Sequence, residues 1–195
     1  MKNFIRRTSC LAILAAILLF QSCKKDDQLV VKEEIKASTT AISKSQKLLP
    51  APPIPDGIYK IRNYNSSKVL EISERPGTNG TPIQQWTDYG AAYQKWEFRD
   101  LGNGYYRIKS VYSDKVMDVN RSSMNDGAWV HQWTWDNGIV QQWALISLGN
   151  GRYLLQNGNS GKVLDIAGGS IENGIQANQN TRNNGWSQQW SIEPA

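Results

Sequence analysis

Short apolar stretches separated by polar turns follow one another from residue 56 to residue 195. An apolar residue alternating with a polar one, which is typical of a half-buried strand, opens three successive segments. The alternating pairs are Tyr59 and Ile61, Tyr106 and Ile108, and Tyr153 and Leu155. A second strand pattern in each segment lies at residues 68–72, 115–119 and 162–166. A third lies around Ile83, Val130 and Ala177, and a fourth includes Phe98, Leu145 and Ile192. The pattern predicts an all-β region with about four short strands in each segment and no long helix.

A fixed period relates the three segments. The triplets that end in Trp96, Trp143 and Trp190 are spaced by 47 residues, and each begins with a glutamine. Repetition at a constant interval of this size indicates repeated structural units. The units 56–102, 103–149 and 150–195 align without a gap. Asn-Gly or Asp-Gly pairs end at Gly80, Gly127 and Gly174, and we expect each of these glycines to adopt a positive φ in a tight turn.

A second triplet lies ten residues before each of the first set. It ends in Trp86 and Trp133 in the first two units but in Asn180 in the third. The downstream tryptophans occur in every unit, as a shared core requires. Burying each of them contributes up to about 4–6 kcal/mol. Gln94, Gln141 and Gln188 open the downstream triplets, and their amides are suited to bridging backbone groups between strands.

The paired Gln-x-Trp triplets, their spacing and the Val-Leu-Asp-Ile motif at 163–166 resemble the ricin B-type lectin family. The resemblance covers residues 56–195 and implies a β-trefoil, in which a six-stranded barrel is capped by three hairpins with pseudo-threefold symmetry. Four-stranded units also build propellers, but three blades fall below the usual minimum of four. We therefore expect a single all-β trefoil domain.

The same resemblance implies a carbohydrate site in each unit, made by an aspartate, an aromatic platform, a polar residue and a glutamine. In the second unit the matching residues are Asp118, Trp133, Asp136 and Gln141. Trp129, His131 and Trp135 are neighbours that could widen the platform.

The other two units depart from this pattern. The first has Trp86, Tyr89 and Gln94, but Glu71 replaces the aspartate, and its extra methylene would push the carboxylate into the space for the sugar. The third unit keeps Asp165 but has Asn180 in place of the aromatic, so we expect it to be silent unless Trp186 substitutes. An asparagine that the family places before the second glutamine is Tyr93, Val140 and Ser187 here. Each site should therefore be weak, with a dissociation constant of about 1 mM, or about −4 kcal/mol.

Composition excludes several other classes of protein. Residues 56–195 contain thirteen basic and thirteen acidic residues, so the overall charge of +5 comes from the N-terminal part, and a nucleic-acid-binding surface is not indicated. His131 is the only histidine, and both cysteines precede the repeats. We therefore expect no enzyme, no metal site, no cofactor and binding that chelators do not affect.

The N-terminus has the pattern of an exported lipoprotein. Lys2, Arg6 and Arg7 precede an apolar run, residues 11–20, that is too short for the roughly 20 residues of a membrane-spanning helix. Residues 19–23 resemble a bacterial lipobox, which implies cleavage after residue 22 and acylation of Cys23. A transmembrane anchor is the alternative.

Residues 23–55 read as an acylated cysteine followed by a flexible, Pro-rich linker. No aspartate directly follows Cys23, so the signal that retains lipoproteins in the inner membrane is not matched. The Lys-Asp-Asp run at 25–27 resembles an export tether of surface lipoproteins, and it is equally compatible with an ordinary solvated charged segment. We expect an outer-membrane lipoprotein of a Gram-negative bacterium that is attached to the membrane by its lipid alone.

The sequence thus predicts a monomeric, non-catalytic carbohydrate-binding domain on a tether, acting through several weak sites. The alternative is a trefoil used for protein contacts, as in an inhibitor or an adhesion module. A cluster of Trp129, Trp135 and Trp186 away from Asp118 would favour the alternative.

Overall fold

The computed structural model describes residues 53–73 and 77–195. The expected signal segment (1–22), Cys23 and most of the expected linker (23–55) lie outside the described residues. The described part contains twelve strands, four in each sequence repeat, as the alternation predicted. Their bounds are β1 (Gly57–Asn63), β2 (Val69–Ile72), β3 (Ile83–Trp86), β4 (Trp96–Asp100), β5 (Tyr106–Ser110), β6 (Val116–Val119), β7 (Ala128–Trp133), β8 (Gln142–Gly149), β9 (Arg152–Asn157), β10 (Val163–Ile166), β11 (Ala177–Asn180) and β12 (Trp190–Pro194).

Six of the strands form a closed ring. The pairs β1–β4, β4–β5, β5–β8, β8–β9, β9–β12 and β12–β1 are all antiparallel. A closed ring leaves none of these six strands with an unpaired edge, which is how barrels avoid edge-to-edge association. The first and last units are joined across β1 and β12, where Ile61 lies opposite Ile192.

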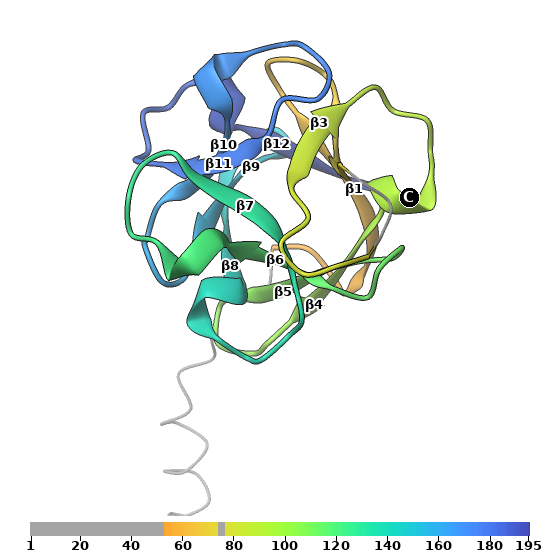
Figure 1. Ribbon diagram of the computed structural model, residues 1–195. Helices are drawn as coiled ribbons and strands as arrows, with labels where there is room; N and C mark the ends of the chain where they lie inside the picture. The colour runs from red at the N-terminus through yellow and green to blue at the C-terminus, as the bar shows by residue number, and fades with distance from the viewer. Residues whose placement is uncertain (1–52, 74–76) are drawn as a thin grey trace, which may run out of the picture. The chain divides into compact units, whose positions relative to one another are not determined.

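The other six strands form three hairpins, β2–β3, β6–β7 and β10–β11. Figure 1 shows these hairpins arranged around a common centre, one from each unit. Five short 3-10 helices are also described: η1 (Ala92–Gln94), η2 (Asn120–Ser122), η3 (Ile139–Gln141), η4 (Ala167–Gly169) and η5 (Trp186–Gln188). The barrel and its three hairpins confirm the predicted β-trefoil.

The core contains the three downstream tryptophans. Trp96, Trp143 and Trp190 have no exposed surface. Each indole Nε1 donates a hydrogen bond to a backbone carbonyl of its own unit, at Leu70, Met117 or Leu164 respectively, over 3.0–3.1 Å. Because a buried indole needs a partner for its N–H, this repeated bond fixes each ring relative to the hairpin above it.

The hairpins of neighbouring units are tied together by the middle glutamines of the upstream triplets. Gln132 of β7 donates to the carbonyl of Thr78 in the first unit, and Gln179 of β11 donates to Ser123 in the second. Gln85 completes the cycle by donating to Ser170 in the third unit. Each hairpin is therefore held in place by contacts with a neighbouring unit. The glycines at 80, 127 and 174 all have positive φ, between 77° and 86°, as predicted for the intervening turns.

The packed structure begins slightly before the expected domain boundary at residue 56. Ile54 is 7% exposed and belongs to the hydrophobic core. Its backbone N–H and carbonyl both bond to the hydroxyl of Tyr106, at 3.1 and 2.6 Å. The packed structure therefore includes Ile54, which lies inside the range expected for the linker. No helix within residues 53–73 and 77–195 has the length and apolar character needed to cross a membrane.

Candidate functional site

The second unit has an open cleft above the β6–β7 hairpin, called here the Asp118 cleft. Asp118 comes from β6, and His131 and Trp133 come from β7. The remaining walls are the η2 loop at Asn120, Arg121 and Ser122, and the segment after β7 at Asp136 and Val140. Its volume is about 360 Å³, within the range of about 300–1,000 Å³ that is usual for small-ligand sites.

Asp118, His131 and Trp133 are joined in one arrangement. Asp118 lies directly opposite His131 in the β6–β7 ladder. The Nε2 of His131 is 3.1 Å from Oδ1 of Asp118, and because a carboxylate only accepts, the imidazole N–H donates. A face of the imidazole stacks on Trp133, with ring centroids 5.4 Å apart and planes inclined by 22°. His131 thus orients a carboxylate and supports an aromatic platform at the same time.

The exposure of these three side chains matches such roles. Asp118 and His131 are each 7% exposed, whereas Trp133 is 40% exposed. Trp133 therefore offers a ring face to solvent, and its other edge packs near the turn of the first unit, where a β-carbon on Gly80 would lie 3.8 Å from Cζ3. The result is a rigid apolar surface beside a hydrogen-bonding carboxylate.

The η2 loop is conformationally costly. Arg121 and Ser122 have φ values of 55° and 50°, in the left-handed region. The equivalent residues of the third unit are Gly168 and Gly169, which adopt the same region at 65° and 63° without a side-chain clash. A non-glycine residue there costs about 1–3 kcal/mol. At the wall of its cleft, the second unit therefore has two residues with a strained, left-handed backbone where the third unit has glycine.

Asp136 is exposed at the site, whereas Gln141 is buried beneath it. Asp136 lines the cleft, and its Oδ1 accepts a hydrogen bond of 2.8 Å from the backbone N–H of Gly138. A β-carbon on Gly138 would lie 2.8 Å from that oxygen, so a larger residue at this position would require the Asp136 side chain to shift. Gln141 is fully buried and bonds the backbone N–H of Asp136 and the carbonyl of Thr134, both at 2.9 Å. Gln141 therefore acts on a ligand only through the loop that it holds.

The first unit presents a more closed version of the arrangement. Glu71 is 6% exposed, and its two carboxylate oxygens accept bonds from the amides of Gln84, at 3.0 Å, and Gln94, at 2.9 Å. Gln94 is itself fully buried. Trp86 packs against the third unit, where a β-carbon on Gly174 would lie 3.3 Å from its ring, and Tyr89 is 66% exposed.

A charged network holds the loop between Trp86 and Tyr89. Asp88 Oδ2 lies 2.7 Å from both Lys60 Nζ and Arg62 Nη2, and Arg62 also pairs with Glu193. Burial favours the neutral carboxyl group, but the hydrogen bonds from Lys60 and Arg62 outweigh it and lower the pKa of Asp88 to about 2. The loop is therefore fixed to the barrel by an ionised carboxylate.

The third unit has an amide where the other units have an aromatic ring. Asn180 donates to Oδ2 of Asp165 at 3.0 Å and accepts from the backbone N–H of Gly127 at 2.8 Å. The same Asp165 oxygen accepts from Gln188 at 3.0 Å, and Asp165 is 4% exposed. No apolar platform is formed by Asn180, and the carboxylate is engaged with protein amides.

The three additional tryptophans do not join the Asp118 cleft. Trp186 packs edge-on against Tyr64, with centroids 5.9 Å apart, so it does not take the place of the missing aromatic at Asn180. The guanidinium of Arg107 lies 5.9 Å from the Trp135 ring. Trp129 lines a separate groove beside the η2 loop. Because each has different neighbours, they do not form the single aromatic cluster that would favour a protein interface.

Some residues of the site were not anticipated from sequence. His131 was expected only as a neighbour of the platform, and Asn120, Arg121 and Ser122 were not expected at all. The signal was nevertheless present, because Arg121 and Ser122 align with Gly168 and Gly169 in the repeat. No grouping of three or more His, Cys, Asp or Glu side chains that could hold a metal ion occurs within residues 53–73 and 77–195.

Comparison with solved structures identifies close matches in fold. The designed threefold-symmetric protein ThreeFoil is 36% identical, with a TM-score of 0.70, and the match covers 72% of this chain and all of that one. An exo-β-1,3-galactanase from Clostridium thermocellum is 33% identical, with a TM-score of 0.70 over 74% of this chain. The match covers 31% of the galactanase, so this chain corresponds to about a third of its length.

A more distant structural match is the ricin B-like lectin of Macrolepiota procera, solved with lactose, at 18% identity and a TM-score of 0.63 over 73% of this chain and 99% of that one. A comparison with curated proteins gives no match. The family model for the ricin-type β-trefoil lectin domain-like family matches residues 46–133 and 140–195. The chain therefore belongs to the ricin-type β-trefoil lectin domain family, a family of carbohydrate-binding domains.

Proposed function

We propose that this protein is a non-catalytic lectin whose principal sugar-binding site is the Asp118 cleft of the second unit. The observation that carries the proposal is the joined arrangement of Asp118, His131 and Trp133. A sugar ring has an apolar C–H face and a rim of hydroxyl groups. The exposed face of Trp133 suits the former, and the oriented carboxylate of Asp118 accepts hydrogen bonds from the latter.

The first unit supports weaker binding in this proposal. Both oxygens of Glu71 are already bonded to amides, so a sugar hydroxyl would have to share or displace one of those bonds. Trp86 and Tyr89 still provide aromatic surface beside it. The third unit, with Asn180 bonded to Asp165, contributes no binding.

A galactose-containing glycan is the first ligand class to test. The galactanase that is 33% identical is named for a galactose polymer, and the Macrolepiota procera lectin was solved with lactose, a disaccharide of galactose and glucose. The Asp118 cleft is open and shallow enough for a terminal sugar, and Val140 adds an apolar wall where the family has an asparagine.

Weak sites act together in this account. At a dissociation constant of about 1 mM per site, retention requires two sites on one chain or many chains at a surface, since linking raises the effective concentration of the second site.

We propose that acylation of Cys23 supplies such a surface, at the outer membrane, with the glycan as partner and the lipid as the only membrane attachment. Metabolic labelling with a fatty-acid analogue tests this, because Cys23→Ala should then abolish labelling of the protein.

A glycan array tests the lectin proposal directly. The wild-type protein should bind spots that carry terminal galactose, and Asp118→Ala should lose most of that binding while keeping its fold by circular dichroism. Asp165→Ala is the matched control, because it removes the equivalent carboxylate of a unit that we expect to be silent. An absence of glycan binding by a folded wild-type protein would reject the proposal.

A further inference from the structure

A second groove adjoins the Asp118 cleft. This Trp129 groove is bounded by Trp129 and Ala128 on β7 and by Met124 and Asn125 on the loop before it, and it has a volume of about 510 Å³. Asn120 and Arg121 line both the groove and the cleft. The two hollows therefore share one wall, which is the strained η2 loop.

The register of the hairpin makes the two hollows parts of one face. Alternate residues of a strand point to the same side, so Trp129, His131 and Trp133 of β7 share a face while Val130 and Gln132 are fully buried on the other. The β6–β7 ladder ends at the pair Val119 and Val130, so Asn120 and Trp129 come directly after that pair and two positions beyond Asp118 and His131.

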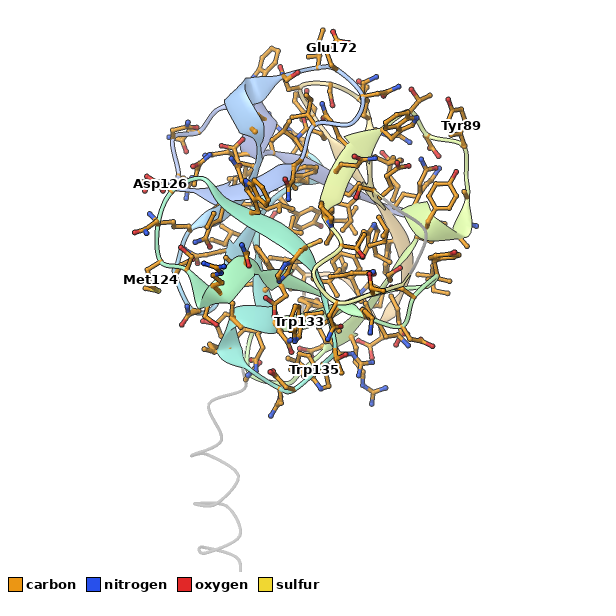
Figure 2. The ribbon with its side chains drawn as sticks, viewed as in Figure 1. Tyr89, Met124, Asp126, Trp133, Trp135 and Glu172 are labelled. Carbon is orange, nitrogen blue, oxygen red and sulfur yellow. The ribbon has the colours of Figure 1, made fainter. Side chains whose placement is uncertain are left out.

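The aromatic row is longer than a single sugar needs. From Trp129 to Trp133 the strand advances by about 13 Å at roughly 3.3 Å per residue. Trp129 is 58% exposed and Trp133 is 40% exposed, and the buried His131 lies between them. Figure 2 shows Met124 and Trp133 near opposite ends of the β6–β7 hairpin, so a ligand that touches both extends along it.

This feature is specific to the second unit. The residues equivalent to Trp129 are Pro82 and Gln176, neither of which offers an aromatic face. The residue equivalent to Arg121 is Gly168 in the third unit, which lacks a side chain to form a wall. The second unit thus has both the most complete cleft and the only tryptophan at this position among the three.

We propose that the Trp129 groove is a second sugar subsite, so that the second unit binds two or more linked sugar residues of one glycan. One ring lies over Trp133 beside Asp118, and a later ring of the same glycan lies over Trp129, with Arg121 between them. The occupant is the continuation of the same glycan because the groove and the cleft adjoin each other along a shared wall at Asn120 and Arg121. This inference rests on the proposed lectin function and adds that the preferred ligand is an oligosaccharide.

Calorimetric titration of the full chain with galactose, β-1,3-linked galactobiose and the corresponding trisaccharide tests the inference. The wild-type protein should bind the trisaccharide about tenfold more tightly than galactose, a gain of ~1.4 kcal/mol. Trp129→Ala should remove this gain and leave galactose binding unchanged, while Trp129→Phe should keep part of it. Trp186→Ala is the matched control, since Trp186 is similarly exposed at 61% but lies outside both hollows.

The outcomes separate the two proposals. If Asp118→Ala weakens all three sugars and Trp129→Ala matches the wild type throughout, the cleft is a sugar site and the second subsite is wrong. Equal wild-type affinity for all three sugars also rejects the subsite. If the wild-type protein binds none of them, both the galactose assignment and the subsite built on it are rejected.

Discussion

The imidazole of His131 lies between the carboxylate of Asp118, 3.1 Å from its Nε2, and the indole of Trp133, whose ring centroid is 5.4 Å away. No equivalent histidine exists in the other units, where Gln84 and Asn178 occupy the same position in the ladder. Gln84 retains the bond to the acid but provides no ring for stacking. The site of the second unit therefore depends on a residue that is unique to it.

Replacing His131 should separate these two roles. We expect His131→Ala to lower affinity for lactose roughly tenfold, about 1.4 kcal/mol, because Asp118 loses its donor and Trp133 loses its support. The affinity of His131→Gln should lie between those of the wild type and His131→Ala, since a glutamine can still donate a hydrogen bond to Asp118 as Gln84 does to Glu71. Calorimetry measures the three affinities. Wild-type affinity in His131→Ala would show that the imidazole does not organise the site.

The core tryptophans should behave differently from the platform. Trp143→Ala removes a fully buried indole together with its bond to Met117, and such a change costs about 3–5 kcal/mol. Since domains are stable by only about 5–15 kcal/mol, the variant should lose a large share of its stability and melt well below the wild-type temperature. Thermal melts followed by circular dichroism check this, with Trp133→Ala as the exposed control. A cooperative Trp143→Ala melt near the wild-type temperature would be inconsistent with this role in the core.

Low pH should remove the ion pairs that attach the loop carrying Tyr89 to the barrel. The pKa of Asp88 is lowered to about 2 from its ordinary 3.8, so the carboxylate contributes stability that is fully present above pH 3.8 and is lost as the pH falls toward 2. Asp88→Asn should therefore be less stable than the wild type at pH 6, and the difference should shrink below pH 3.8. Urea unfolding at pH 6 and pH 2.5 measures this. A difference that stays constant between these pH values would mean that the ion pairs with Lys60 and Arg62 contribute nothing.

The third unit should be silent. Asn180 bonds both Oδ2 of Asp165 and the N–H of Gly127, and the other oxygen, Oδ1, is buried, so removing Asp165 should change stability but not sugar binding. We expect Asp165→Asn to bind lactose with the same affinity and stoichiometry as the wild type. A loss of one binding equivalent in that variant would establish a working third site.

Much of the fold could be predicted from the sequence because one physical constraint repeats three times. The tryptophans at 96, 143 and 190 recur at a constant spacing since they fill one shared core, and Gly80, Gly127 and Gly174 recur since the same turn needs a positive φ. Any residue required by the threefold architecture occurs at the same position in all three repeats, which makes it easy to recognise.

The site was harder to predict for the same reason. Its distinctive residues, His131 and Arg121, occur once and depart from the repeat. Gln94 and Gln141 are fully buried, and their amides hold the adjoining loops, while Gln94 also donates a hydrogen bond to the carboxylate of Glu71. The left-handed backbone at Arg121 and Ser122 was visible in sequence only through the two glycines at the equivalent positions, Gly168 and Gly169.

The most direct test of the account is a titration of the ¹⁵N-labelled protein with lactose, followed by two-dimensional amide spectra. The account predicts that the indole N–H of Trp133 and the backbone amides of residues 118–122 and 133–138 shift together, with smaller changes around Trp86 and none at Asn180. Asp118→Ala should abolish the large shifts. Shifts confined to other parts of the surface, such as Tyr64 and Trp186, or a spectrum unchanged by lactose and by longer galactose oligosaccharides, would contradict it.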